Sequence, residues 1–308
     1  MKAIRTIHRT LLLGACVLLA GGAGAADKKE LPPRPSVADI LKTSKPTDWR
    51  ALDPDNTLYM EMPWGRVVIE MSPVFAPNHV RNIKALARSG YYDGLAIVRV
   101  QDNWVVQWAD PKDETPDARP VKGAQKTLKA EFTVPMANDK HFTRLSDVDG
   151  YAPQVGHSDG FPVGRDPKTG ETWLAHCYGM VAVARDNDAD SGGGTALYAV
   201  LGPARHLDRN LTVVGRVISG MPQLAALPRG PMPMGFYDKP GMNVPITSVK
   251  VAADVPLAER SKFEVMRTES AVYQAVLDAQ RNRGGSFTKY SAGYLDLCAA
   301  PIPVREQP

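Results

Sequence analysis

One arginine in a run of β-branched residues is the side chain in this sequence best suited to chemistry. Arg99 lies between Val98 and Val100, and Gln107 follows eight positions later. A guanidinium stays protonated at physiological pH, so an arginine held among apolar side chains must find an acceptor. That acceptor is either a carboxylate at the edge of a sheet, which is the ordinary structural role, or a ligand.

The residues around Arg99 predict two β-strands, which would hold this arginine on a sheet. β-branched residues are frequent over residues 97–107, and Asp102-Asn103 supplies turn-forming residues in the middle. We therefore expect two strand segments joined at Asp102-Asn103, with Arg99 in the first and Gln107 in the second.

The preceding residues predict a β-hairpin and a helix. Residues 57–62 and 66–71 alternate on either side of Trp64-Gly65, as in a hairpin. Pro77 suits the first position of a helix, and Gly90 ends it. Apolar residues recur on one face of this helix at Val80, Ile83, Leu86 and Ala87.

In order and spacing, these segments resemble the cyclophilin family of peptidyl-prolyl cis-trans isomerases. Arg99, the aromatic Trp104 and Gln107 match the active-site strands of that family, and residues 90–94 (Gly-Tyr-Tyr-Asp-Gly) match the turn before them. The resemblance runs from residue 57 to about residue 251. It implies a mainly β fold, a closed eight-stranded antiparallel barrel capped by two helices.

The resemblance also implies where the remaining parts of the barrel lie. Strands are expected within residues 174–185, 194–200 and 213–221, and the second helix is expected to start at the end of the last of these segments. Residues 245–251 would form the final strand.

The activity that the resemblance implies is the isomerisation of X-Pro peptide bonds. Arg99 would place its charge beside the prolyl nitrogen and stabilise the twisted amide, while Gln107 would brace Arg99 and donate to the substrate carbonyl. The walls of the proline pocket would be Trp104, Val105, Tyr198 and Leu207, and further substrate-binding positions would be Ala184, Arg185, His206 and Leu211.

Several of these positions depart from the family pattern. Trp104 and Tyr198 stand where the family usually has Phe, Ala196 replaces a Gln, and Leu211 replaces a His. His206 occupies the site of an aromatic residue that often binds cyclosporin. The two polar-to-apolar changes remove hydrogen-bonding groups, so we expect low activity and weak cyclosporin sensitivity. The alternative is a proline-peptide-binding module or chaperone without catalysis.

The first 26 residues have the layout of a secretory signal peptide. Lys2, Arg5 and Arg9 precede an apolar stretch over residues 11–20, and residues 23–26 (Ala-Gly-Ala-Ala) offer a cleavage site. The sequence therefore predicts a periplasmic or secreted protein. Removing this segment leaves 37 − 3 = 34 basic against 33 acidic residues, so the formal charge falls from +4 to +1.

A near-neutral mature chain without a Lys/Arg block gives no support for nucleic acid binding. No later apolar run reaches the ~18 residues that span a bilayer. We expect a monomer that acts on proline-containing polypeptides and needs no metal or organic cofactor.

The three cysteines leave two questions open. Cleavage before Cys16 would give a lipid-anchored protein, but only six residues separate Arg9 from Cys16, fewer than a leader's apolar region requires. Cys177 and Cys298 could form a disulfide in an exported protein, which we slightly favour, or both could be buried thiols.

Four regions are expected along the chain. They are the signal peptide (1–26), a Pro-rich lead with a helical turn near residues 37–41 (27–56), the cyclophilin-like domain (57–253) and an extension with one helix over residues 269–279 (254–308). An insertion at residues 133–173, rich in Gly, Pro and Asp, interrupts the domain. A segment of this length usually has a function or packs independently, and the sequence assigns it no role.

Two motifs point to other chemistry. Residues 156–160 match G-x-S-x-G, but a nucleophile elbow needs a strand before the serine and a helix after it, and Pro153 and Pro162 argue against both. Residues 186–190 resemble half of a calcium loop that lacks the required Gly at position six and Glu at position twelve.

Overall fold

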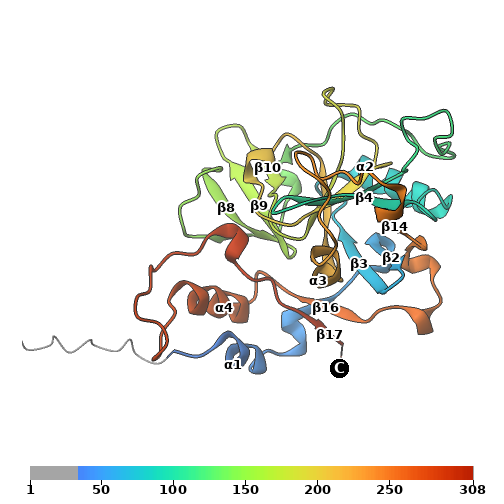
Figure 1. Cartoon of the computed structure of the whole chain (residues 1–308). Coiled ribbons are helices and arrows are strands. Elements are labelled where there is room, and N and C mark those ends of the chain that lie inside the picture. The colour runs from blue at the N-terminus through green and yellow to red at the C-terminus, as the bar shows by residue number, and fades with distance from the viewer. Residues whose placement is uncertain (1–33, 308) are drawn as a thin grey trace, which may run out of the picture.

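The protein, as a computed structural model that describes residues 34–307, is built around one curled antiparallel sheet (Figure 1). Its nine strands are β2 (Thr57–Met62), β3 (Gly65–Met71), β4 (Ala96–Gln101), β5 (Val105–Ala109), β11 (Met180–Val183), β12 (Leu197–Val200), β13 (Val213–Ser219), β14 (Val244–Pro245) and β15 (Ser248–Val251). Their order in the sheet is β14-β4-β5-β12-β11-β13-β3-β2-β15. The helices α2 (Pro77–Arg88) and α3 (Met221–Ala225) pack against the hydrophobic core of this sheet.

The expected mainly β, antiparallel fold is confirmed as a curled sheet, while the expected closure into an eight-stranded barrel stays a prediction. The sheet has nine strands because the final strand, expected over residues 245–251, is replaced by two short strands that pair with opposite edges, β14 with β4 and β15 with β2. Only two residues separate these edge strands, so the sheet must curl strongly. The two strands predicted around Arg99 are present as β4 and β5, and Asn103 adopts a left-handed φ of 50° in the turn between them.

Side chains alternate between the two faces of this sheet. The enclosed face forms the inner core, whose members include Met60, Ile69, Ile83, Leu86, Ile97, Val100, Val106, Trp108, Val181 and Leu197. Burial of one such side chain stabilises the fold by about 1.5–3 kcal/mol. The opposite face carries a second set of buried residues, which the insertion and the extension help to cover.

The insertion forms a sheet of its own. It contains β6 (Val134–Pro135), β7 (Phe142–Leu145), β8 (Gln154–Ser158), β9 (Phe161–Asp166) and β10 (Glu171–Leu174), in the order β6-β10-β9-β8-β7. The expectation that no strand precedes Ser158 was wrong, because Ser158 ends β8. A second strand, not a helix, follows it, and the Ser158 hydroxyl donates to Asp139, so these residues form a hairpin instead of a nucleophile elbow.

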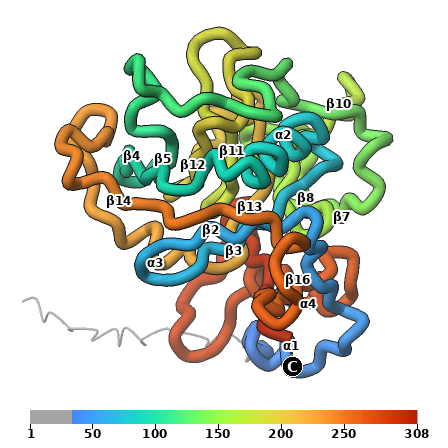
Figure 2. The backbone as a smooth tube through the Cα atoms, turned by 90° about the vertical axis from the view of Figure 1, so that its right-hand side faces the viewer, coloured from blue at the N-terminus to red at the C-terminus, as the bar shows by residue number. Residues whose placement is uncertain are grey.

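The N-terminal lead and the C-terminal extension pair with each other. The strands β1 (Trp49–Ala51), β16 (Phe263–Met266) and β17 (Val304–Glu306) form a third sheet. The helix α1 (Val37–Lys42) packs against α4 (Ala271–Arg281), below the main sheet in Figures 1 and 2. The helix expected at 269–279 begins at residue 271, because the Ser270 hydroxyl caps it by accepting from the backbone N–H of Tyr273.

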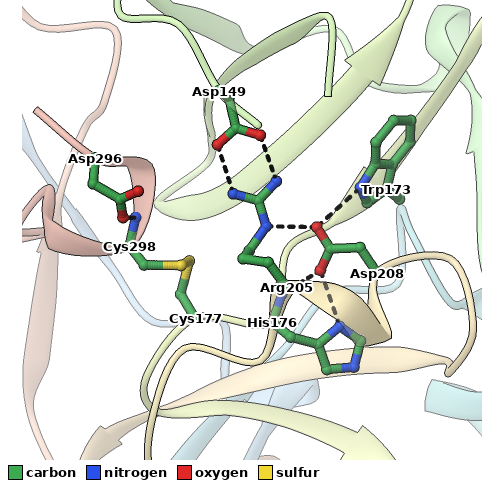
Figure 3. Close-up of a disulfide and its surroundings, with 8 residues drawn as sticks. All are labelled: Asp149, Trp173, His176, Cys177, Arg205, Asp208, Asp296 and Cys298. Atoms are coloured by element: carbon green, nitrogen blue, oxygen red, sulfur yellow. Dashed lines mark hydrogen bonds and ion pairs between the residues drawn. A yellow bond between two sulfur atoms is a disulfide. The ribbon is translucent and has the colours of Figure 1, made fainter. Parts of the chain in front are cut away.

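A disulfide between Cys177 and Cys298 joins the extension to the domain (Figure 3). The bridge that the sequence slightly favoured is therefore the arrangement in the structure. Across residues 34–307, no helix has the length and apolar character needed to cross a membrane. The predicted signal peptide and Cys16 lie outside the described residues.

The outer core is the hydrophobic cluster on the outer face of the main sheet. It combines residues of three parts of the chain: Val105, Met180, Ala182, Tyr198 and Val200 from the domain, Leu145, Val155, Val163 and Trp173 from the insertion, and Met266, Tyr273, Leu277 and Leu297 from the extension. The three parts therefore share one desolvated interior.

Candidate active site

A β-bulge turns Arg99 toward the outer face of the sheet. The register between β4 and β5 shifts between Ile97 and Arg99. Ile97 and Val100 both belong to the inner core, which strict alternation would not allow. Because the bulge inserts one extra residue, Arg99 and Gln101 point away from the inner core, as bulges beside functional sites commonly re-aim a side chain.

Neutral oxygens hold the Arg99 guanidinium. Its Nε donates to the carbonyl oxygen of Met234 (2.6 Å), its Nη1 donates to Oε1 of Gln107 (3.3 Å), and its Nη2 donates to Oε1 of Gln101. Among residues 34–307, no carboxylate forms an ion pair with Arg99. Partial burial lowers the pKa of Arg99 below its usual value, against the raising influence of Tyr198, and the group remains a cation. Its charge is braced but not neutralised.

Two aromatic rings flank this cation. The Arg99 Cζ lies 5.2 Å from the ring centre of Trp104 and 4.8 Å from that of Phe236. Phe236 belongs to a segment that runs beside β4, where the backbone N–H of Val100 donates to the carbonyl of Gly235 (2.9 Å). The rings add cation–π stabilisation without cancelling the charge.

The predicted pocket residues lie together on the outer face. Gln107 pairs with Arg99 on one side and with Tyr198 of β12 on the other. Val105 and Tyr198 are buried in the outer core, and the remaining predicted residues packed against it are Trp104, Ala184, Leu207 and Leu211. Burial raises the pKa of Tyr198 well above its usual value, so its hydroxyl stays protonated.

Two predicted positions are more exposed. Arg185 donates from Nε (3.1 Å) and Nη2 (2.8 Å) to the carbonyl of Asn210, which holds its guanidinium in place. His206 is exposed, and its ring centre lies 6.2 Å from that of Trp104. Ala196, which replaces the family's glutamine, holds Ala184 in place through its backbone: its carbonyl accepts from the backbone N–H of Ala184 (3.0 Å).

Sequence reasoning missed the residues that hold Arg99 from the other side. Gln101 could have been predicted as a neighbour of Arg99, because residues two apart on a strand share a face. Met234 and Phe236 could not have been, since they follow Arg99 by more than 130 positions and carry no local signal.

A comparison with protein families identifies the family that carries this site. Residues 57–251 match the family described as cyclophilin type peptidyl-prolyl cis-trans isomerase. The chain is a member of the cyclophilin family. Arg99, Gln107 and all the predicted pocket residues fall within the matched part of this cyclophilin.

Relatives of this cyclophilin carry the same activity in their names. A probable peptidyl-prolyl cis-trans isomerase of Brucella suis biovar 1 is 27% identical over 187 residues, which cover 58% of this chain and 75% of the relative. Human peptidyl-prolyl cis-trans isomerase-like 1 is 23% identical over 210 residues, covering 67% and 98%.

A solved cyclophilin also shares the surrounding architecture. The crystal structure of AquaCyp293 from Hirschia baltica has a TM-score of 0.67 and 25% identity, over 89% of this chain and 98% of that chain. Because residues 57–251 make up less of the chain than this, the match includes residues outside the family domain.

Proposed function

We propose that this cyclophilin catalyses cis-trans isomerisation of X-Pro bonds in exported polypeptides, with Arg99 as the catalytic residue. The observation that carries the proposal is the set of acceptors around Arg99. Two amide oxygens and one carbonyl orient the guanidinium, and within residues 34–307 no carboxylate neutralises it. A fixed cation can therefore act on a substrate atom.

The chemistry requires no covalent step. Rotation about an X-Pro bond has a barrier of about 18–20 kcal/mol because the C–N bond has partial double-bond character. When the prolyl nitrogen becomes pyramidal, it regains lone-pair density. A cation beside that nitrogen stabilises the twisted state more than either planar state, which is the condition for catalysis.

The neighbours of Arg99 suit the rest of this task. The Oε1 of Gln107 accepts from Arg99, which leaves the amide nitrogen of Gln107 to donate to the substrate carbonyl. Trp104, Val105, Tyr198 and Leu207 supply the apolar wall for a pyrrolidine ring. To raise an uncatalysed rate of ~10⁻² s⁻¹ to ~10³ s⁻¹, the site must supply about 7 kcal/mol of differential stabilisation.

A protease-coupled assay on an Ala-Pro peptide tests the proposal. Arg99→Ala is expected to lower kcat/KM by about 10²–10³-fold, the usual cost of losing one preorganised electrostatic group. The matched control is Arg88→Ala, which removes an exposed arginine of α2 paired with Asp254 and is expected to change kcat/KM by less than about twofold. Full activity in Arg99→Ala would refute the role of Arg99.

The same assay separates the enzyme from a binding module. If the wild-type protein binds the Ala-Pro peptide in titration calorimetry but gives no rate above the thermal background, the enzyme proposal fails. The protein would then be a non-catalytic proline-peptide-binding module or chaperone.

We also propose a periplasmic or secreted location, as the signal-peptide pattern in residues 1–26 suggests. The Cys177–Cys298 disulfide supports this location, because structural disulfides persist in oxidising compartments. Fractionation of cells that express the full chain tests it. Recovery of uncleaved protein in the cytoplasm, with reactive Cys177 and Cys298 thiols, would contradict it.

A further inference from the structure

The turn that carries two of the pocket residues is fixed from behind by a buried ion network. This turn is the short helix η4 (Arg205–Leu207), which precedes Asp208. The Arg205 Nε donates to Oδ2 of Asp208 (2.6 Å), and its Nη1 and Nη2 donate to the two carboxylate oxygens of Asp149 (2.8 and 3.0 Å), as Figure 3 shows. Asp149 belongs to the insertion, so the insertion reaches the back of the pocket.

The network continues from Asp208 to the wall of the pocket. Asp208 Oδ1 accepts from the backbone N–H of His176 (2.8 Å) and lies 3.2 Å from His176 Nδ1. The other ring nitrogen of His176 lies 3.2 Å from the Tyr198 hydroxyl. If Nδ1 donates to Asp208, Nε2 accepts from Tyr198, and one chain of hydrogen bonds joins Arg205 to the Tyr198 side chain.

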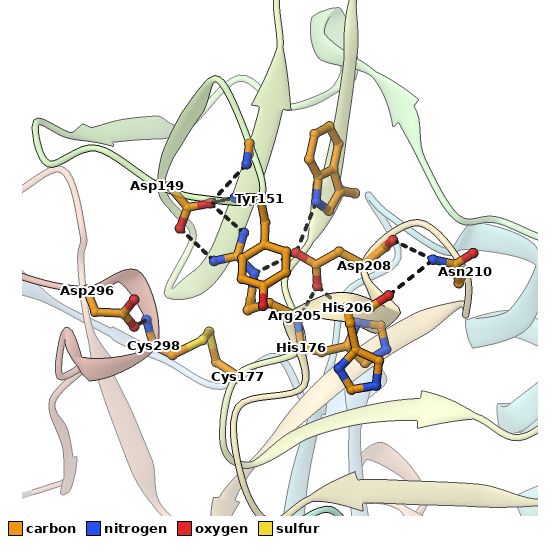
Figure 4. Close-up of polar contacts among 12 residues, drawn as sticks. Asp149, Tyr151, His176, Cys177, Arg205, His206, Asp208, Asn210, Asp296 and Cys298 are labelled. Atoms are coloured by element: carbon orange, nitrogen blue, oxygen red, sulfur yellow. Dashed lines mark hydrogen bonds and ion pairs between the residues drawn. A yellow bond between two sulfur atoms is a disulfide. The ribbon is translucent and has the colours of Figure 1, made fainter.

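The insertion is shaped to present Asp149 at this position. Asp149 Oδ1 accepts from the backbone N–H groups of Tyr151 (2.8 Å) and Ala152 (2.9 Å). The Tyr151 ring covers Arg205, whose Cζ lies 5.0 Å from the ring centre (Figure 4). The side chains of Asp149, Arg205 and Asp208 are all 5% exposed or less, so water does not compete for these contacts.

We propose that Asp149 is a positioning residue of the proline pocket, through which the insertion at residues 133–173 sets the affinity for prolyl peptides. The hydrogen bonds of the Asp149 side chain go to Tyr151, Ala152 and Arg205, none of which is a predicted substrate-binding residue. Asp149 fixes Arg205, which determines where the neighbouring His206 and Leu207 lie. The inference rests on the proposed function, because the pocket is assigned there.

A second aspartate of the same loop provides a matched control. Asp147 lies two residues before Asp149 and accepts from Arg281 of α4 (2.6 Å from Nη2) and from the backbone N–H of Leu295 (3.0 Å). Its side chain is 6% exposed, against 4% for Asp149. Each aspartate therefore anchors the insertion through a bidentate arginine, but only Asp149 leads to the pocket.

The experiment compares Asp149→Asn with Asp147→Asn in steady-state kinetics on an Ala-Pro peptide. Asp149→Asn is expected to raise KM about tenfold, the effect of weakening one hydrogen-bonded charge contact, while kcat changes less than about twofold. Asp147→Asn is expected to lower the thermal midpoint of unfolding as much as Asp149→Asn does, and to leave KM unchanged. Asp149→Glu, which keeps the charge, is expected to recover part of the wild-type KM.

Peptide binding measured by titration calorimetry keeps this inference separate from catalysis. If the wild-type protein shows no turnover, the proposed function fails, but the tenfold difference in peptide dissociation constant between wild type and Asp149→Asn is still expected. An equal rise in KM for both asparagine variants, or no rise for either, would overturn the proposal. Should Asp149→Asn not fold, Arg205→Lys, which cannot form the bidentate pair, is expected to show the same KM change, and an unchanged KM there would overturn it.

Discussion

Arg99, in the proposed proline pocket, and Arg205, in the ion network behind it, have opposite surroundings. Neutral oxygens hold Arg99, and burial lowers its pKa. Burial would also lower the pKa of Arg205, but the carboxylates of Asp208 and Asp149 outweigh that effect and raise it. An arginine whose charge is already compensated can only support the fold, whereas one that is oriented but uncompensated can act on a substrate.

The largest expected effect concerns stability. Arg205→Met would leave Asp149 and Asp208 buried without their cation, so the free energy of unfolding is expected to fall by about 3–5 kcal/mol. Arg99→Met removes no ion-pair partner and is expected to cost less than about 1 kcal/mol. Urea denaturation monitored by circular dichroism measures both. Equal losses would show that the two arginines do not differ in the way their acceptors indicate.

A smaller effect concerns the orientation of Arg99. Gln107→Ala removes one hydrogen bond to the guanidinium while Gln101 and Met234 still hold it. The loss of this one brace is expected to lower kcat/KM about tenfold, which corresponds to about 1.4 kcal/mol of transition-state stabilisation. The urea midpoint should stay near that of the wild type. A loss as large as that of Arg99→Ala would mean that the brace and the proposed donation by Gln107 to the substrate carbonyl together matter as much as the charge of Arg99.

The smallest effect is a pH dependence confined to the compensated site. Burial raises the pKa of Asp208, but the hydrogen bonds from His176 and the attraction of Arg205 together lower it below its usual value. A carboxyl with a lowered folded pKa stabilises the protein above the unfolded value of about 3.9, and this contribution is lost as the pH falls through the folded pKa.

Asp208→Asn should therefore be less stable than the wild type at pH 7 and should lose less stability between pH 5 and about pH 2.5. Arg99→Ala should lose as much as the wild type over this range. Unfolding free energies measured by urea denaturation across the range test this. A wild-type pH dependence in Asp208→Asn would assign the acid sensitivity to other carboxyl groups.

Local sequence patterns predicted the elements that carry the candidate site. The β-branched run with Asp102-Asn103 at its centre became β4 and β5, and the apolar spacing after Pro77 became α2. Such patterns are informative because strand and helix periods bring near neighbours in sequence to one face. Because β4 and β5 are neighbours in sequence and form a hairpin, Arg99 lies opposite Gln107.

Other features depended on contacts between distant residues. The division of residues 244–251 between two sheet edges, the separate sheet of the insertion and the pairing of the lead with the extension all follow from partners far along the chain. The periodicity of a short segment does not indicate which distant segment it will pair with. The strand before Ser158 was also missed, because Pro153 and Pro162 suppress the local strand signal although the hairpin tolerates both.

By itself, the sequence determined which residue types could act: an obligate cation on a strand, an amide eight residues away and aromatic residues for an apolar wall. The tertiary structure decided what each charge meets. The bulge before Arg99 and the carbonyl of Met234, 135 residues away, orient one guanidinium without cancelling it. Asp149, 56 residues before Arg205, neutralises the other. Whether an arginine is free to act depends on its acceptors, and folding alone brings those together.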